Sequence, residues 1–344
     1  MTAAAPSTLA ARARDVALFA ALALALLVGL NLFLRAALEG SALYEGAQGK
    51  LTLTRAELTR RWEGARAALG GAAPLDLLLV GLSSLRDGVD APALTAALQA
   101  RRPGARALSL TGSGGSLEGL AYFMGGPLRD AALRARVVVV GVHPLWLAGW
   151  TPLRGEEGGA RALGRGALWG LTHRLAFSQA WRALTDAGRE AWLLGALGAP
   201  RAALYPPAAD PWSYAPVARP AAVASEALLA RQWAEWARMG RLDPARYAEV
   251  GAGQAAALRG LLGELRGRAG RVWVVLMPER ARLRDALPPA ARQLLSDAVE
   301  RALGAGALLD AAALAPDEEL YDYVHLNAAG RARLTAWLSA LAGR

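Results

Sequence analysis

The stretch LLLVGLSSLRDGVD, at residues 77–90, is an apolar run that gives way at once to glycine and serine. A continuous apolar run bounded by turn residues is typical of a strand that is covered on both faces. Runs of this kind recur along the chain, and we expect strands at Asp76–Val80, Ala107–Leu110, Val137–Val142, Arg271–Met277 and Ala307–Asp310. Helical segments alternate with them, which predicts an α/β fold with a parallel sheet and right-handed crossovers.

The long interval between Val142 and Arg271 contains no strong strand pattern. It holds amphipathic helical patterns instead, near 159–195, 222–239 and 249–268. The proline-rich segment Tyr205–Pro220 breaks these patterns. We therefore predict a helical insertion at about 145–268, on the side of the sheet where the strands end. An insertion there can form a lid or an acceptor-binding wall.

An uncharged apolar run, VALFAALALALLVGLNLFL, occupies residues 16–34. At about 1.5 Å per residue, a helix of this length spans the roughly 30 Å hydrocarbon layer of a bilayer. Arg12 and Arg14 precede the run, which predicts a cytoplasmic N-terminus and a single-pass anchor at 1–38 in the inner (plasma) membrane. A mainly helical connector is expected at 39–72, and the remaining chain is then periplasmic or otherwise extracytoplasmic.

A cleavable signal peptide is the first alternative to this anchor. The apolar region of a signal peptide is usually shorter and ends in small residues at a cleavage site, whereas this run ends in LFLRAALEG. A buried core helix is the second alternative, but the run has no polar face. Both comparisons favour an uncleaved anchor.

The composition excludes several classes of function. The 344 residues are 54% hydrophobic, which is enough for a buried core and argues against disorder. The net charge of +10 comes almost wholly from scattered arginines, so we expect no nucleic-acid binding and favour a basic surface facing anionic lipid or polysaccharide. The chain has no cysteine and three histidines, which excludes thiol chemistry and argues against a multi-histidine metal site. We expect no cofactor.

The stretch DEELYDYVHLNAAGRARLTAWL, at residues 317–338, carries the strongest chemical signal. Asp322 and His325 lie three residues apart, just before an amphipathic helix for which Asn327 is a plausible N-cap. This spacing lets the carboxylate reach the imidazole, select its tautomer and stabilise its cation. A salt-bridged surface pair is the alternative interpretation.

Ser83 carries the second signal, because it lies where the first strand gives way to a loop. A serine there is expected at the carboxyl edge of the sheet, beside backbone N–H groups that can stabilise an oxyanion. The adjacent Ser84 is the rival candidate for a reactive serine at this position. A simple turn without a chemical role is the alternative interpretation for both serines.

Together these two stretches resemble the SGNH/GDSL hydrolase superfamily over roughly residues 75–342. The last block of that family is D-x-x-H-L-N-x-x-G, which Asp322, His325, Leu326, Asn327 and Gly330 match in turn. The segment GLSSLRDG resembles the G-x-S-x-x-x-x-G form of the first block in membrane-anchored relatives. Those relatives often act with membrane-bound O-acyltransferases on cell-surface polymers.

The resemblance implies a role for each matching residue. Ser83 would be the nucleophile, His325 the general base and Asp322 the residue that orients it. The backbone N–H of Ser83 would supply one oxyanion donor. The loop at 111–116 (TGSGGS) resembles the glycine block that supplies another, so Gly112 and Gly114 are candidates.

Two positions depart from the family pattern. Leu82 replaces the Asp of the first block, and His143 stands where the third block normally has an Asn that donates to the oxyanion. A histidine can also donate, so His143 is a third oxyanion candidate; a loop histidine without a chemical role is the alternative. A missing side-chain donor typically lowers the rate by about 100- to 1000-fold.

Several other side chains admit two interpretations. Trp146 and Trp150 could line the site, whereas Trp233 and Trp236 share one helical face and suit packing. Arg86 could hold an anionic substrate, although a surface ion pair with its neighbour Asp87 is the simpler expectation.

These observations predict a flavodoxin-like three-layer α/β/α sandwich at 73–344, preceded by one transmembrane helix. The implied function is that of a serine esterase or O-acyltransferase acting through an acyl-serine intermediate on an extracytoplasmic glycan or cell-envelope polymer. The implied partners are the bilayer, through residues 16–34, and a membrane-bound O-acyltransferase. The alternative is a non-catalytic, membrane-anchored binding subunit on a degenerate SGNH scaffold, which Leu82 and His143 keep open.

Overall fold

The computed structural model describes residues 16–19, 22, 48–70, 74–112, 115–149 and 223–342. The chain divides into two compact units, Met1–Leu53 and Thr54–Arg344, and the second contains the sheet. Within the described ranges, no helix is long and apolar enough to cross a membrane. Most of the anchor expected at 16–34 lies outside those ranges, as do Arg12 and Arg14, so the anchor stays a prediction.

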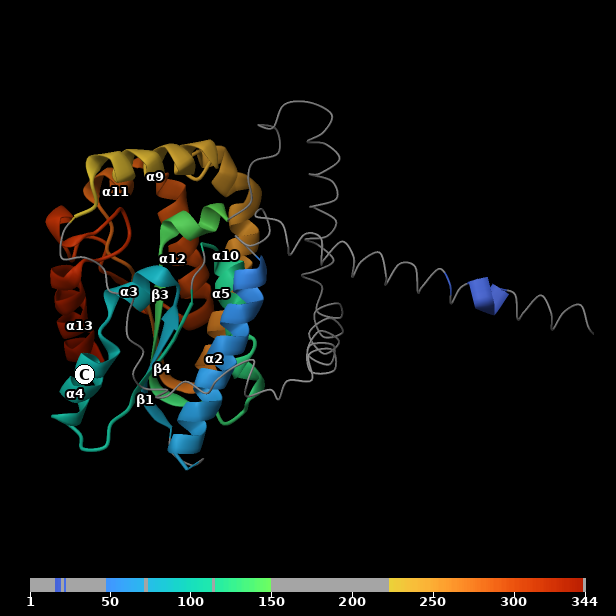
Figure 1. Cartoon of the computed structure of the whole chain (residues 1–344), viewed down its shortest axis with the longest axis vertical. Coiled ribbons are helices and arrows are strands. Elements are labelled where there is room, and N and C mark those ends of the chain that lie inside the picture. Colours follow the sequence, from blue (N-terminus) through green and yellow to red (C-terminus); the bar gives the residue numbers. More distant parts are fainter. Residues whose placement is uncertain are drawn as a thin grey trace, which may run out of the picture. The chain divides into compact units, whose positions relative to one another are not determined.

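Five parallel strands form one sheet in the order β2-β1-β3-β4-β5 (Figure 1). The strands are β1 (Leu75–Gly81), β2 (Ala107–Thr111), β3 (Ala135–Val142), β4 (Ala269–Leu276) and β5 (Leu308–Asp310). Every strand expected from the sequence is present, with ends that agree to within two residues. The prediction of an α/β fold with a parallel sheet is therefore confirmed.

Helices flank both faces of the sheet (Figure 1). One face carries α3 (Ser83–Gly88), α4 (Ala91–Gln99) and α13 (Ala328–Ala342). The other carries α5 (Leu117–Met124), α10 (Pro244–Arg266), α12 (Pro289–Leu303) and the part of α2 (Gln48–Ala68) that belongs to the second unit. The remaining helical elements are η1 (Pro127–Arg129), η2 (Pro144–Ala148), α9 (Glu226–Arg238), α11 (Ala281–Ala286) and η3 (Asp317–Glu319).

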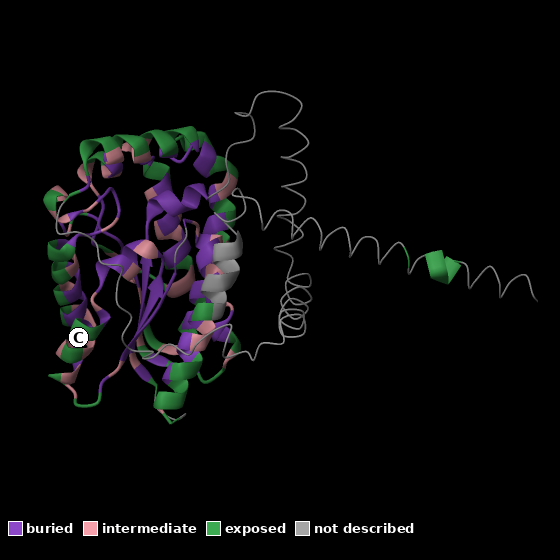
Figure 2. Ribbon diagram, in the orientation of Figure 1, coloured by how far each residue is buried: buried purple, intermediate pink, exposed green. Residues whose placement is uncertain are grey.

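The core explains why the strand sequences are continuously apolar. Leu77 and Leu79 pack with Val139, Val275 and the helices of one face. The intervening residues, such as Leu78, point to the opposite face because side chains alternate along a strand. Since both faces are covered, β1, β2 and the carboxyl-terminal parts of β3 and β4 are buried nearly throughout, whereas the short edge strand β5 is not (Figure 2).

The expected helical insertion is described only in its last part. Helix α9 matches the pattern near 222–239, and α10 begins at Pro244, five residues before the pattern near 249–268. Helix α10 leads into β4 and packs against α5 and α12, so it serves as the crossover helix between β3 and β4. The stretches near 159–195 and 205–220 lie outside the described residues.

Candidate active site

Ser83 lies at the carboxyl end of β1, where the chain changes direction. Leu82 is extended, with φ −106° and ψ −165°, and α3 begins at Ser83. Glycine is needed just before this turn, because a Cβ at Gly81 would lie 2.8 Å from the Leu85 side chain and 3.2 Å from the Gly141 carbonyl oxygen. The close approach of α3 to β1 and β3 thus presents Ser83 at the edge of the sheet, while Leu82 is fully buried.

The structure brings Ser83, His325 and Asp322 together in one hydrogen-bonded chain. His325 Nε2 lies 2.9 Å from Ser83 Oγ, and His325 Nδ1 lies 2.8 Å from Asp322 Oδ2 and 2.9 Å from Oδ1. A carboxylate can only accept, so Nδ1 carries the proton of the neutral ring. Nε2 is then the acceptor for the Ser83 hydroxyl, which is the arrangement that a general base requires.

Asp322 is held as an acceptor by its own loop. Its Oδ1 accepts backbone N–H groups from Val324 and His325, each at 2.9 Å. Burial raises the pKa of the Asp322 carboxyl, but the hydrogen bond and charge of His325 and the backbone amides outweigh burial, so this pKa lies below its usual value. Asp322 therefore stays ionised at neutral pH and continues to select the His325 tautomer.

Helix α13 joins the two sequence blocks, which are 242 residues apart at Ser83 and His325. Its apolar face, with Leu334 and Leu338, packs in the cluster that contains Leu85 of α3. Asn327 Oδ1 accepts the N–H groups of Ala329 at 3.0 Å and Gly330 at 3.2 Å, so the predicted N-cap is confirmed. The last motif therefore starts the helix that docks the histidine loop against the serine turn.

Additional polar contacts hold α13 against that turn. Arg331 Nε donates to the Asp87 carbonyl at 2.9 Å, and the Asp90 N–H donates to Thr335 Oγ1 at 3.0 Å. Arg86 forms the expected pair with Asp87, at 2.7 Å between Nε and Oδ1, but the pair is buried and not on the surface. The Asp87 side chain is fully buried, and the Arg86 side chain is 12% exposed.

Ser84, the rival nucleophile, occupies a different environment. It is 1% exposed, and its Oγ has no hydrogen-bond partner among the described residues. Ser83 is partly exposed and is the serine that contacts His325. The geometry therefore favours Ser83 over Ser84 as the residue with an available base.

The oxyanion donors expected from the sequence are not equally free. The N–H of Gly112 donates to the Gly81 carbonyl at 3.0 Å, which extends the pairing of β1 and β2, so the role expected of Gly112 requires that this bond break. Gly114 lies outside the described residues. The N–H of Ser83 opens α3, and the first amides of a helix have no acceptor within the helix.

His143 lies in the protein interior and not on an open surface, and the oxyanion role expected of it stays a prediction. It is fully buried, and its Nδ1 accepts the Leu145 N–H at 3.1 Å as the N-cap of η2. Its Nε2 lies 2.7 Å from Oε2 of buried Glu279, a close contact without the alignment of a directed hydrogen bond. Arg292 binds the other oxygen of Glu279.

Burial, followed by the positive charge of Arg292, lowers the pKa of His143 to about 3. The hydrogen bond from Leu145 acts in the same direction, because Nδ1 cannot accept an N–H once it is protonated. His143 is therefore neutral near pH 7. It stabilises the loop after β3, at the position where the sequence predicts an oxyanion donor.

The free energy of unfolding is expected to fall as pH drops below the ordinary histidine value of 6.5. Below that pH, His143 binds a proton in the unfolded chain, whereas in the native protein it stays unprotonated down to about pH 3. The slope should be roughly 1 kcal/mol per pH unit for this residue. His143→Asn keeps an N-cap side chain and removes the titration, so urea unfolding of this variant across pH should show a shallower acid dependence. An unchanged dependence would contradict the assignment.

Aromatic side chains cover the loop that carries Asp322. Trp233 and Trp236 of α9 pack against Tyr323, with ring centroids 5.3 and 5.6 Å apart, so the packing role expected of the two tryptophans is confirmed. Trp146 is 4% exposed and also packs inside, at 6.3 Å from the His143 ring. Trp150 lies outside the described residues, as does the third histidine of the chain, His173.

Sequence reasoning missed two residues that follow β4, Glu279 and Arg280. Glu279 contacts His143, and Arg280 donates to carbonyl groups of the loop that carries Asp322. The available signal was their position, because polar residues at the carboxyl ends of parallel strands gather at one edge of the sheet.

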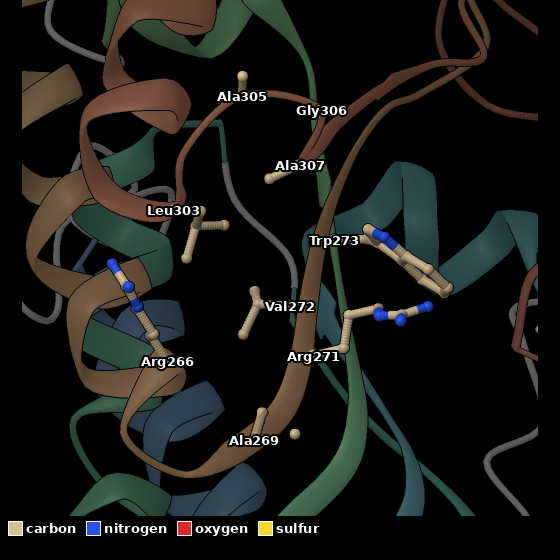
Figure 3. Close-up of a pocket in the computed structure, with 10 residues that line it drawn as sticks. Arg266, Ala269, Arg271, Val272, Trp273, Leu303, Ala305, Gly306 and Ala307 are labelled. Atoms are coloured by element: carbon tan, nitrogen blue, oxygen red, sulfur yellow. The ribbon is translucent and has the colours of Figure 1, made fainter.

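A shallow pocket of about 290 Å³ lies elsewhere, at the start of β4. Figure 3 shows Arg271 and Trp273 on one side of the strand, and Val272 and Arg266 on the other. Their side chains do not converge on a common point. This pocket contains none of the residues of the hydrogen-bonded triad, so it does not bear on the chemistry.

The chain matches no protein-family model, no curated protein and no solved structure.

Proposed function

We propose that this chain is a serine esterase or O-acyltransferase of the SGNH/GDSL kind. The observation that carries the proposal is the chain of hydrogen bonds from Ser83 through His325 to Asp322. A serine hydroxyl is unreactive at neutral pH unless a positioned base removes its proton, and this geometry supplies the base and the residue that orients it. The strand order also agrees with a flavodoxin-like three-layer sandwich.

The reaction proceeds through an acyl-serine intermediate. His325 Nε2 takes the proton of Ser83 as Oγ attacks the ester carbonyl, and the tetrahedral oxyanion forms near the N–H of Ser83. The C–O bond to the leaving alcohol then breaks, and the imidazolium returns the proton to that alcohol. Water or an acceptor hydroxyl next attacks the acyl-serine, with His325 again as base, and regenerates Ser83.

The proposed substrate is an acyl ester of an extracytoplasmic glycan or cell-envelope polymer. This step rests on the resemblance, in which anchored members act with membrane-bound O-acyltransferases. The uncharged run at 16–34 and the arginines before it support an inner-membrane anchor with the catalytic domain outside the cytoplasm.

Fluorophosphonate labelling of the full-length protein tests the proposal, because it asks only whether an activated serine exists. The folded wild type is expected to label and to hydrolyse a small activated ester, while the same protein after heat denaturation does neither. A folded protein that never labels at any pH, yet binds a glycan or a partner protein, would establish the non-catalytic subunit instead. Buried Leu82 and His143, which offer no side-chain donor to the site, are what favour that second candidate.

A further inference from the structure

Arg280 lies just after β4 and faces the loop that carries Asp322 and His325. Its Nε donates to the Asp322 carbonyl at 3.2 Å, and its Nη2 donates to the Leu320 carbonyl at 3.3 Å. Its backbone N–H donates to the Tyr323 carbonyl at 3.1 Å. One residue thus satisfies three carbonyl groups of a single loop.

The loop also has contacts of its own: Asp322 Oδ1 accepts the N–H groups of Val324 and His325, and the Tyr321 N–H donates to the His325 carbonyl at 2.7 Å. It contains no helix or strand between η3 and α13, only the isolated bridge between Leu320 and Leu326. The Tyr321 carbonyl accepts the N–H of Ala224 at 2.7 Å. Every carbonyl from Leu320 to Tyr323 therefore has a donor from another segment, and Arg280 supplies all but one of them.

Arg280 acts from a backbone that is itself anchored. The Met277 N–H donates to the Val142 carbonyl at 2.9 Å, and the Glu279 N–H donates to the Ala312 carbonyl at 3.1 Å. The buried Glu279 side chain is held by Arg292 and contacts His143. The segment from Met277 to Arg280 is therefore tied to the ends of β3 and β5, so the guanidinium reaches the loop from a rigid base.

We propose that Arg280 is a positioning residue that holds the Asp322 carboxylate in line with His325. This inference rests on the proposed function, because it assigns Arg280 to the serine chemistry through the histidine loop. Its side chain donates to backbone carbonyls of that loop and not to the carboxylate, so its contribution is geometric. Small displacements of catalytic groups are costly: a shift of about 1 Å can cost roughly 100-fold in rate.

Replacing Arg280 with alanine should lower the rate of fluorophosphonate labelling by about 10- to 100-fold. In ester hydrolysis the loss should appear in kcat with little change in KM, because Arg280 acts through the histidine loop. Arg280→Gln, which keeps N–H donors without the charge, should recover part of the rate. Arg284→Ala, in the helix α11 that Arg280 precedes as N-cap, is the matched control, since the Arg284 side chain has no hydrogen bond or ion pair among the described residues. A folded Arg280→Ala protein that labels at the wild-type rate would overturn the proposal.

A proton NMR measurement separates this inference from the proposed function, because it does not depend on turnover. The Nδ1–H of His325, bound to Asp322, should give a low-field signal that is absent in His325→Gln. The signal should broaden or disappear in Arg280→Ala and persist in Arg284→Ala. If it persists unchanged in Arg280→Ala and Arg280→Gln, the positioning role fails even where the wild type labels. If the His325 signal behaves as expected but the wild-type protein does not react with fluorophosphonate, only the catalytic proposal fails.

Discussion

Replacing Ser83 with alanine is expected to abolish fluorophosphonate labelling and to lower kcat for an activated ester by about 10,000-fold or more. Ser83 Oγ is the hydroxyl within hydrogen-bond distance of His325 Nε2, so no nucleophile remains in line with the base when it is removed. The fold should be unaffected, because Ser83 is partly exposed and α3 has no side-chain cap at its start. Labelling of the purified variant, with circular dichroism to verify folding, measures both outcomes.

Ser84→Ala is the matched control for this prediction. Its Oγ is buried without a partner among the described residues, so its removal leaves no hydrogen bond unmade and should not destabilise the protein. Ser84→Ala should label like the wild type. If Ser84→Ala no longer labels and Ser83→Ala still does, the nucleophile is Ser84 and not Ser83.

The sheet could be predicted from the sequence because its strands are buried on both faces. Such strands appear as continuous apolar runs, and runs such as VVVVGV differ sharply from the amphipathic helices around them. The strand ends were predicted less accurately: β3 starts at Ala135 and β4 at Ala269, each two residues before its predicted start at Val137 or Arg271. These first residues are paired by the neighbouring strand, at Ala135 with Ala269, and pairing cannot be read from one segment alone.

The pairing of Asp322 with His325 could be predicted because it is local, whereas the contact of His325 with Ser83 was expected from the resemblance to the SGNH/GDSL superfamily. Carboxyl ends of parallel strands meet at one edge, which brings residues far apart in sequence together. The orientation of His143 could not be predicted in this way. It depends on the buried Glu279 and the half-buried Arg292, which come from other segments of the chain, so a local sequence pattern does not indicate it.

The inward orientation of His143 has a consequence for rate. If neither His143 nor the engaged N–H of Gly112 stabilises the oxyanion, the Ser83 N–H is the remaining donor among those expected from the sequence that the structure describes. Loss of one donor typically costs about 100- to 1000-fold in kcat. Slow hydrolysis, or transfer from a pre-activated acyl donor, tolerates such a loss better than rapid turnover of a stable ester.

Replacing Asp322 with asparagine should lower kcat and the labelling rate by about 10,000-fold while the fold persists. The amide oxygen that Asp322→Asn introduces can still accept the N–H groups of Val324 and His325, which Asp322 Oδ1 accepts in the wild type. The amide nitrogen then faces His325 Nδ1 and donates to it, which moves the ring proton to Nε2. A protonated Nε2 cannot accept the Ser83 proton, so the nucleophile loses its base although every backbone contact remains.

Two comparisons decide this prediction for Asp322. Because members of a triad act as a unit, the double variant Ser83→Ala with Asp322→Asn should be no slower than Ser83→Ala alone. Because hydrogen bonds hold the pKa of Asp322 below its usual value, the wild-type rate should show no carboxylate inflection above the ordinary Asp value of 3.8. Asp322→Asn protein that is folded and retains roughly a tenth or more of the wild-type kcat would show that His325 needs no carboxylate, and the triad would reduce to a serine–histidine pair.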